Sequence, residues 1–383
     1  MNVLFVNRLS FDYLGGVESH ILNLGSELMR IGHSVTLVFD QKTQKRAAPA
    51  RCENVPMIGV DGLPGLRRFF EDHGTEYDIM HGHMSRKVFV LQAFRLAKKA
   101  GLPTVFTPHC FYPAHSFLGK LARALYDATF TRATLASCDI VISLTPGDQK
   151  DVLGFGLQRC KSRIIPNSIA LDKFQRATDA DFRTKFSVSR PYLLHIGRFE
   201  AQKRIDLLVT WHQDVPADLD LVLIGQDDGE LERIRTQVST LGLTKRIHIL
   251  PSLPADDVIA SYAQAEMLVM ASRNEGLPTV ILEAMAKDVP VVVPNVGGIP
   301  FIVKSGVSGW IYPGGNREGY LEGVRMATQN RAAWTRVAAQ DLYENFSWER
   351  NAQKVLAEYQ SLLQRTPLHA IKSAPPIESN PGS

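Results

Sequence analysis

The chain has 383 residues, 45% of them hydrophobic and 21% charged, so it can bury more apolar surface than one hydrophobic core normally holds. The formal net charge of +4 is unremarkable, and we expect no nucleic-acid partner. The four cysteines are widely spaced, without a CxxC pair, which excludes a zinc-finger pattern and favours a reducing compartment.

No hydrophobic run approaches the roughly 20 apolar residues that a membrane-spanning helix needs. Residues 1–6 lack the basic region and the cleavage site of a signal peptide and are typical of a first strand. We therefore expect a cytoplasmic protein that is soluble or, at most, peripheral to a membrane.

Short runs rich in Val, Ile and Leu alternate with longer stretches of helical periodicity, which is typical of βαβ units around a parallel sheet. The first series of predicted strands covers residues 3–6, 34–40, 56–60, 78–83, 104–109, 139–145 and 163–166. After the mostly polar residues 168–189, a second series covers residues 192–197, 219–225, 246–250, 267–271 and 289–294. The sequence therefore predicts an α/β fold with two Rossmann-like, doubly wound domains, whose ligands bind beyond the carboxyl ends of the strands.

The predicted boundaries follow these two series. We expect an N-terminal domain at residues 1–170 and a C-terminal domain at residues 171–346. Residues 347–364 begin with a Ser N-cap and continue with apolar residues at helical spacing, which predicts a last helix that packs back toward the N-terminal domain. Pro, Ser and Asn dominate residues 365–383, which predicts a disordered tail.

Positive charge is concentrated in the first half of the chain. Residues 1–170 carry 20 Lys and Arg against 14 Asp and Glu, a net charge of +6. Much of this excess lies in residues 86–99 and 120–132, where apolar residues interleave at helical spacing. Such helices can rest on an anionic membrane surface, or they can present a solvated face above a buried one.

The first βα turn, residues 7–16, lacks the G-x-G-x-x-G pattern of a dinucleotide-binding site and contains only the pair Gly15 and Gly16. Adjacent glycines let a backbone approach a ligand closely, and the amides at a helix start favour an anion. The pair equally fits a structural turn.

Two basic residues follow the first predicted strand of the second domain. In HIGRFEAQKR, residues 195–204, we expect Arg198 and Lys203 to emerge at the carboxyl edge of the sheet. Two fixed cations there could neutralise a diphosphate leaving group without a metal, although solvated loop charges are an alternative.

The most specific segment is EGLPTVILE, residues 275–283, which places two carboxylates eight positions apart. We expect Thr279 to cap a helix over residues 280–287, with free amides at the helix start binding phosphate oxygens. Glu275 and Glu283 could accept hydrogen bonds from hydroxyls on either side, an arrangement that suits a nucleotide sugar. The predicted donor-binding residues here are Glu275, Gly276, Leu277, Pro278, Thr279, Val280 and Glu283.

Two other chemistries are disfavoured. Two carboxylates also suit a glycosidase, but a glycosidase needs neither phosphate-seeking cations nor helix ends. The D-x-D patterns at residues 179–181 and 218–220 lie in polar connections away from the motifs, and His81 and His83 share one strand face with no third ligand nearby in sequence. We therefore expect no metal and no other cofactor.

Five stretches in this order carry a family resemblance: GGVESHILNLGSELMRIGHSVTLV, IIPNSIALDKF, LLHIGRFEAQKRIDLLV, NEGLPTVILEAMAKDVPVVVPNVGGIP and FSW. The chain resembles a family 4 glycosyltransferase of the GT-B fold up to about residue 364. That fold implies two Rossmann-like domains facing across a cleft. It also implies an acceptor on the first domain and a nucleotide sugar on the second.

The resemblance also implies roles for single residues. The glycine pair approaches the donor diphosphate, which Arg198 and Lys203 clamp. Glu275 contacts the transferred sugar and Glu283 the ribose, while His109 lies near the sugar and the acceptor. His81 and His83 then line the acceptor side.

By the same resemblance, a hexose passes with retention from a UDP-sugar or GDP-mannose to a polysaccharide precursor, a lipid-linked oligosaccharide or a glycolipid. The departing phosphate takes the acceptor's proton, and no bound divalent metal is needed. The basic stretches 86–99 and 120–132 would hold the enzyme at the inner face of the membrane. A nucleotide-sugar epimerase and a non-catalytic nucleotide-sugar-binding subunit are the alternatives. Phe301 and Pro251 stand where the family commonly has Glu and Gly, which leaves the donor open.

Overall fold

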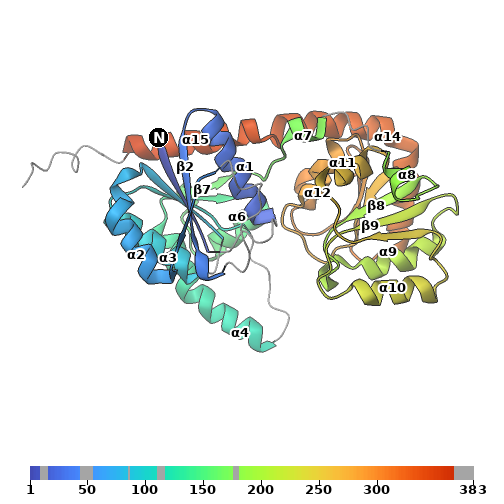
Figure 1. Cartoon of the computed structure of the whole chain (residues 1–383), viewed down its shortest axis with the longest axis horizontal. Coiled ribbons are helices and arrows are strands. Elements are labelled where there is room, and N and C mark those ends of the chain that lie inside the picture. Colours follow the sequence, from blue (N-terminus) through green and yellow to red (C-terminus); the bar gives the residue numbers. More distant parts are fainter. Residues whose placement is uncertain (9–15, 44–54, 85–86, 110–116, 176–180, 366–383) are drawn as a thin grey trace, which may run out of the picture. The chain divides into compact units, whose positions relative to one another are not determined.

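A computed structural model of the chain describes residues 1–8, 16–43, 55–84, 87–109, 117–175 and 181–365 (Figure 1). The chain forms two compact units. Unit 1 comprises Met1–Ile142, Asp151–Arg163 and Ala352–Ser383, and unit 2 comprises Ser143–Lys150 and Ile164–Asn351. The units are thus assembled from separate chain segments, whereas the sequence predicted contiguous domains that meet after residue 170.

Unit 1 is built on a seven-stranded sheet in the order β3-β2-β1-β4-β5-β6-β7. Its strands are β1 Asn2–Asn7, β2 Ser34–Asp40, β3 Met57–Val60, β4 Ile79–His83, β5 Thr104–Thr107, β6 Ile140–Ser143 and β7 Ser162–Ile164. Strand β1 pairs in parallel with β2 on one side and β4 on the other. The winding direction therefore reverses between β1 and β4, and such a switch point is where doubly wound sheets bind ligands.

Helices cover this sheet because their apolar stripes match its buried strands. They are α1 Gly16–Arg30, α2 Gly62–His73, α3 Val88–Lys99, α5 Arg132–Ser137, α6 Pro146–Gly154 and α15 Trp348–Arg365, of which α6 and α15 each contribute residues to both units. A further helix of unit 1 is α4, Phe117–Tyr126. A π-helical turn, Asp127–Thr131, joins α4 to α5.

The two basic stretches have different environments. Helix α3 buries Phe89, Phe94 and four other residues while its basic residues face outward, as expected for a solvated face above a core. Around α4, in contrast, Leu121 is 63% exposed and Leu125 is 68% exposed. Among the described residues of the two stretches, exposed large apolar side chains are concentrated in the second.

Unit 2 has a six-stranded sheet in the order β10-β9-β8-β11-β12-β13. Its strands are β8 Tyr192–Ile196, β9 Asp220–Ile224, β10 Ile247–Leu250, β11 Met267–Val269, β12 Val291–Pro294 and β13 Trp310–Tyr312. The two doubly wound sheets confirm the predicted fold class. The sequence missed β13, a three-residue edge strand between a glycine and a proline, because so short a run has no periodicity.

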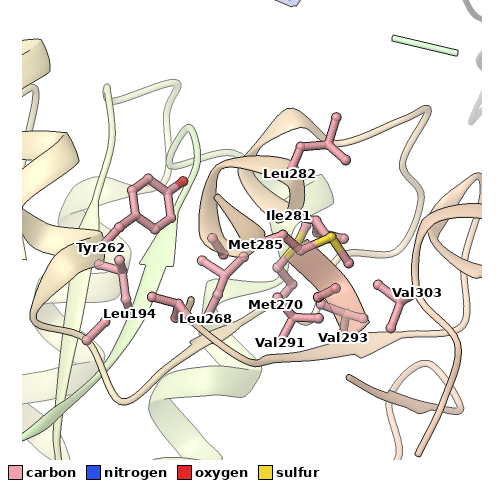
Figure 2. Packing of buried hydrophobic residues seen from close by; sticks show 14 of the residues in the cluster. Leu194, Tyr262, Leu268, Met270, Ile281, Leu282, Met285, Val291, Val293 and Val303 are labelled. Atoms are coloured by element: carbon pink, nitrogen blue, oxygen red, sulfur yellow. The ribbon is translucent and has the colours of Figure 1, made fainter. Parts of the chain in front are cut away.

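Side chains of β8 alternate between two cores, as the period of a strand requires. Tyr192 and Leu194 belong to one apolar cluster and Leu193 to the other. Figure 2 shows the first cluster, where Leu194 and Leu268 of adjacent strands pack beneath Ile281 and Met285 of α12, Thr279–Met285.

The remaining helices of unit 2 lie on both faces of its sheet, with α9 and α10 on one face and α11 and α12 on the other (Figure 1). They are α7 Leu171–Gln175, α8 Phe182–Lys185, α9 Ile205–Trp211, α10 Leu231–Thr240, α11 Ala255–Ala263, α13 Ile299–Ile302 and α14 Arg317–Asn345. Across the described residues, no helix has the combined length and hydropathy of a membrane span.

Two fully buried histidines make the stability of unit 2 depend on pH. Burial lowers the pKa of His195 to about 4 and that of His212 to about 3. Below pH 6.5 the unfolded chain protonates these rings and the folded chain does not, so stability present above that pH is lost as the pH falls toward 4.

We expect each of these rings to lower the free energy of unfolding by about 1.4 kcal/mol between pH 7.5 and 5.5. Urea unfolding at several pH values measures this loss. In His212→Gln, unfolding below pH 6.5 should take up about one proton fewer, so the free energy of unfolding should depend less steeply on pH. An unchanged slope in that variant would contradict the assignment.

Candidate functional site

Arg198 follows β8 at the carboxyl edge of the sheet of unit 2, where the sequence predicted it. Its guanidinium donates to Asp228, with Nη1 2.6 Å from Oδ2, and pairs with Glu200, with Nη2 3.0 Å from Oε2. The side chain is 47% exposed. Arg198 is thus an oriented cation at the surface, held by two carboxylates.

Lys203 lies deeper and contacts a residue 72 positions further along the chain. Its Nζ is 2.8 Å from Oε1 and 3.0 Å from Oε2 of Glu275. The Lys203 side chain is 17% exposed and that of Glu275 6%. The structure therefore joins two predicted site residues directly, as a partly buried ion pair beside the point between β8 and β11 where the strand order reverses.

Backbone contacts fix the two loops that carry this pair. The amide of Arg273 donates to the carbonyl of Gln202 at 2.9 Å, and the Gln202 side chain donates to the carbonyl of Asn274 at 2.9 Å. Each bond lies one or two residues from Lys203 or Glu275. The pair is therefore positioned by the loops themselves.

A turn containing two glycines, Gly297 and Gly298, packs closely against the backbone of the Glu275 loop. Gly297 has φ of +55°, and a Cβ placed on it would lie 1.7 Å from the carbonyl oxygen of Glu275. The Gly298 amide donates to the carbonyl of Gly276 at 2.9 Å. From sequence alone, this turn had no role beyond its part in the family resemblance. The adjacent glycines were the signal that a backbone packs closely here.

The helix after Glu275 differs from the prediction. Thr279 is the first residue of α12, Pro278 takes the N-cap position without a side-chain cap bond, and the helix ends at Met285. The predicted cap at Thr279 was wrong, because Thr279 is already the first helical residue. Leu277 is buried in the apolar cluster of unit 2, and Val280 packs against that cluster.

Glu283 lies on α12 and accepts a hydrogen bond from the hydroxyl of Tyr262 on α11, at 2.8 Å. Burial raises the pKa of Glu283, while the hydrogen bonds from Tyr262 and Thr279 oppose the rise. Sequence reasoning missed Tyr262, because nothing local links a tyrosine to a carboxylate 21 residues away.

In unit 1, the first glycine of the predicted pair, Gly15, lies outside the described residues. Gly16 is the first residue of α1, and a Cβ placed on it would meet no described atom within 4 Å. Packing among the described residues therefore gives no reason for a glycine at this position.

His109 follows β5 with a left-handed φ of +66° and is 6% exposed. Its ring centroid lies 4.8 Å from that of His20 on α1 and 5.6 Å from that of His83 on β4. Burial holds the pKa of both His83 and His109 well below the usual value. These rings are neutral at physiological pH.

His81 and His83 share one face of β4, as predicted, and their rings stack with centroids 4.2 Å apart. The Nδ1 of His81 is 2.6 Å from the Tyr359 hydroxyl, and its Nε2 is 2.8 Å from the Thr107 hydroxyl. The prediction that His81 lines the acceptor side was wrong, because the ring is buried with both nitrogens bonded within unit 1.

The two departures from the family pattern lie at the surface of unit 2. Pro251 follows β10 and is exposed. Phe301 of α13 is 38% exposed, and its ring meets Phe346 edge-on, with centroids 6.1 Å apart.

Comparison with known families matches most of the chain. Residues 14–173 match the profile described as "Glycosyltransferase Family 4", and residues 177–346 match the profile described as "Glycosyl transferases group 1". The D-inositol 3-phosphate glycosyltransferase of Xylanimonas cellulosilytica is 25% identical over 92% of this chain and 93% of its own. The phosphatidylinositol N-acetylglucosaminyltransferase GPI3 subunit of Saccharomyces cerevisiae is 24% identical over 79% of this chain and 70% of its own.

Solved structures show the same fold at low sequence identity. The sucrose-phosphate synthase of Thermosynechococcus elongatus superposes with a TM-score of 0.77 at 19% identity, over 95% of this chain and 99% of its own. HepE of Anabaena, solved with UDP and glucose, superposes with a TM-score of 0.77 at 19% identity, over 94% of this chain and 100% of its own.

The two matched family models, which together cover most of the chain, define a glycosyltransferase. The chain belongs to the family 4 glycosyltransferases and has the GT-B fold, as the sequence resemblance indicated.

Proposed function

We propose that the chain transfers a hexose, with retention of anomeric configuration, from a UDP-sugar or GDP-mannose to a saccharide or lipid-linked acceptor. The observation that carries the proposal is the partly buried Lys203–Glu275 pair at the switch point of unit 2. The solved structure of HepE with UDP and glucose supports a nucleotide-sugar donor. The named relatives support an inositol- or lipid-linked acceptor.

In this proposal the ion pair serves both parts of the donor. An ammonium group has three N–H donors, of which the Glu275 carboxylate takes two, so the third is directed to a phosphate oxygen. Glu275 accepts from hydroxyls of the transferred sugar, and Glu283, oriented by Tyr262, accepts from the ribose. Fixed charges stabilise the departing diphosphate, which takes the acceptor's proton.

The remaining predicted residues complete the proposed site. The pair Gly15 and Gly16 approaches the diphosphate, and amides between Gly276 and Val280 add hydrogen bonds to it. His109, whose backbone after β5 is left-handed, is proposed to lie near the transferred sugar and the acceptor.

The test separates three activities. A transferase consumes the nucleotide sugar only with an acceptor, an epimerase interconverts the donor alone, and a binding subunit does neither. Thermal-shift screening across nucleoside diphosphates selects the donor first, because a ligand that binds only the folded state raises its melting temperature. Donor binding without turnover, unaffected by Glu275→Gln, would overturn the proposed transfer.

Arg198→Ala should lower kcat/KM by the equivalent of about 2 to 4 kcal/mol, by comparison with the loss of one oxyanion donor. Its half-exposed ion pairs contribute at most about 1 kcal/mol to stability, so unfolding should change little. Steady-state kinetics and urea unfolding measure the two effects, and near wild-type turnover would rule out the clamp.

The affinity of the protein for UDP should be equal in EDTA and in Mg²⁺, because the proposed clamp needs no metal.

The exposed apolar residues around α4 support a proposed contact with an anionic membrane surface. Leu121, Leu125 and Phe130 are exposed beside the exposed Arg132, a combination of apolar and basic groups that suits the lipid interface. Sedimentation with anionic liposomes at low salt tests this contact. Leu121→Gln with Leu125→Gln should abolish it, whereas Leu63→Gln, at an exposed site on α2, should not. Equal sedimentation of all variants would exclude α4.

A further inference from the structure

Three buried histidines meet at the carboxyl edge of the sheet of unit 1. His20 comes from α1, His83 ends β4 and His109 follows β5. One ring nitrogen from each can be chosen so that all three lie within 4.8 Å of one another. No third ligand lies near His81 and His83 in the sequence, because His20 and His109 come from distant parts of the chain.

From this geometry we propose that His20, His83 and His109 form a binding site for one divalent transition-metal ion, with Zn²⁺ as the best fit. Zinc takes imidazole nitrogens at about 2.0 Å in a tetrahedron, which sets the ring centroids roughly 5 Å apart. The observed centroid separations are 4.8, 5.6 and 5.8 Å. Side-chain rotation supplies the remaining approach of about an ångström.

Ring nitrogens without hydrogen-bond partners also support a metal site. Within the described structure, both ring nitrogens of His83 and the Nε2 of His109 are buried without a hydrogen-bond partner. Buried polar atoms are nearly always bonded, and a bound ion is one reason for an exception. His81 is not a ligand, because Tyr359 and Thr107 occupy both its nitrogens, and its ring stacks on His83 and fixes that ring's orientation.

Three protein ligands leave the fourth position of a tetrahedral ion open for water or another oxygen ligand. The metal site lies in unit 1, whereas the cations assigned to the diphosphate lie in unit 2. Binding of the diphosphate without a metal and binding of an ion by the histidines are therefore compatible, and the metal proposal does not rest on the proposed function.

The test uses untagged full-length protein and Co²⁺ as a visible probe. We expect one Co²⁺ per chain with the d–d absorption of a tetrahedral nitrogen site, displaced by Zn²⁺. His20→Ala, His83→Ala and His109→Ala should each weaken binding at least about 10-fold, the effect of losing even an outer-shell partner. His73→Ala, at a half-exposed ring paired with Glu76, should bind as the wild type does.

X-ray absorption of the zinc-loaded wild-type protein keeps the test decisive if a variant fails to fold. Three imidazole nitrogens at about 2.0 Å would support the site. The proposed site would be overturned by a zinc coordination shell with fewer than three imidazoles, or by the absence of a d–d absorption band from one Co²⁺ per chain. Unchanged Co²⁺ affinity in folded His20→Ala, His83→Ala and His109→Ala would also overturn it.

Discussion

Lys203→Met is expected to reduce both the activity and the stability of unit 2. It removes the cation beside a carboxylate that is 6% exposed, and breaking a buried ion pair from one side typically costs about 3 to 5 kcal/mol. It also removes the proposed diphosphate contact, which should lower kcat/KM by the equivalent of about 2 to 4 kcal/mol. Urea unfolding and steady-state kinetics measure the two losses separately.

The double variant Lys203→Met with Glu275→Gln separates stability from chemistry. The double variant has no carboxylate left without a cation, so its free energy of unfolding should be higher than that of Lys203→Met. Its activity should stay low. If activity returned together with stability, the pair would be structural and the proposed diphosphate contact would be wrong.

Gly297→Ala should be the most damaging single-methyl change in unit 2. The residue has φ of +55°, which costs a residue with a Cβ about 1 to 2 kcal/mol, and the new Cβ would lie 1.7 Å from the Glu275 carbonyl oxygen. Relieving that overlap moves the Glu275 loop, and overpacking of this kind adds about 1 to 3 kcal/mol. We expect a loss of about 2 to 5 kcal/mol in urea unfolding and a large fall in turnover.

Gly315→Ala is the matched control. Gly315 also has a positive φ, +80°, but a Cβ there meets no described atom within 4 Å. Only the backbone strain applies, so this variant should lose about 1 to 2 kcal/mol and keep its activity. Equal effects of the two substitutions would show that the contact with the Glu275 loop is unimportant.

The sequence predicted most of the fold because buried parallel strands are short apolar runs that local patterns reveal. It predicted that the last helix packs toward the N-terminal domain, but not which residues it contacts, because contacts between distant segments leave no local signal. The bond from His81 to Tyr359 spans 278 residues, and it helps hold the last helix to unit 1.

The site was predictable only in part. Strand order places the residues after β8 and β11 at one edge of the sheet, so the proximity of Lys203 and Glu275 follows from the fold class. Their direct pairing, the role of Tyr262 and the meeting of three histidines depend on side-chain directions and loop lengths. No periodicity in the chain encodes these features.

The segmented construction of unit 1 has a consequence for its synthesis. Every strand of this unit's sheet has been translated once the ribosome has passed Ile164, yet the helix bearing Tyr359 is translated only after all but a few residues of unit 2. Until then the Nδ1 of His81 lacks its partner in the nascent first unit. Domains generally fold in the order in which they emerge, but here the first to emerge is the last to be completed.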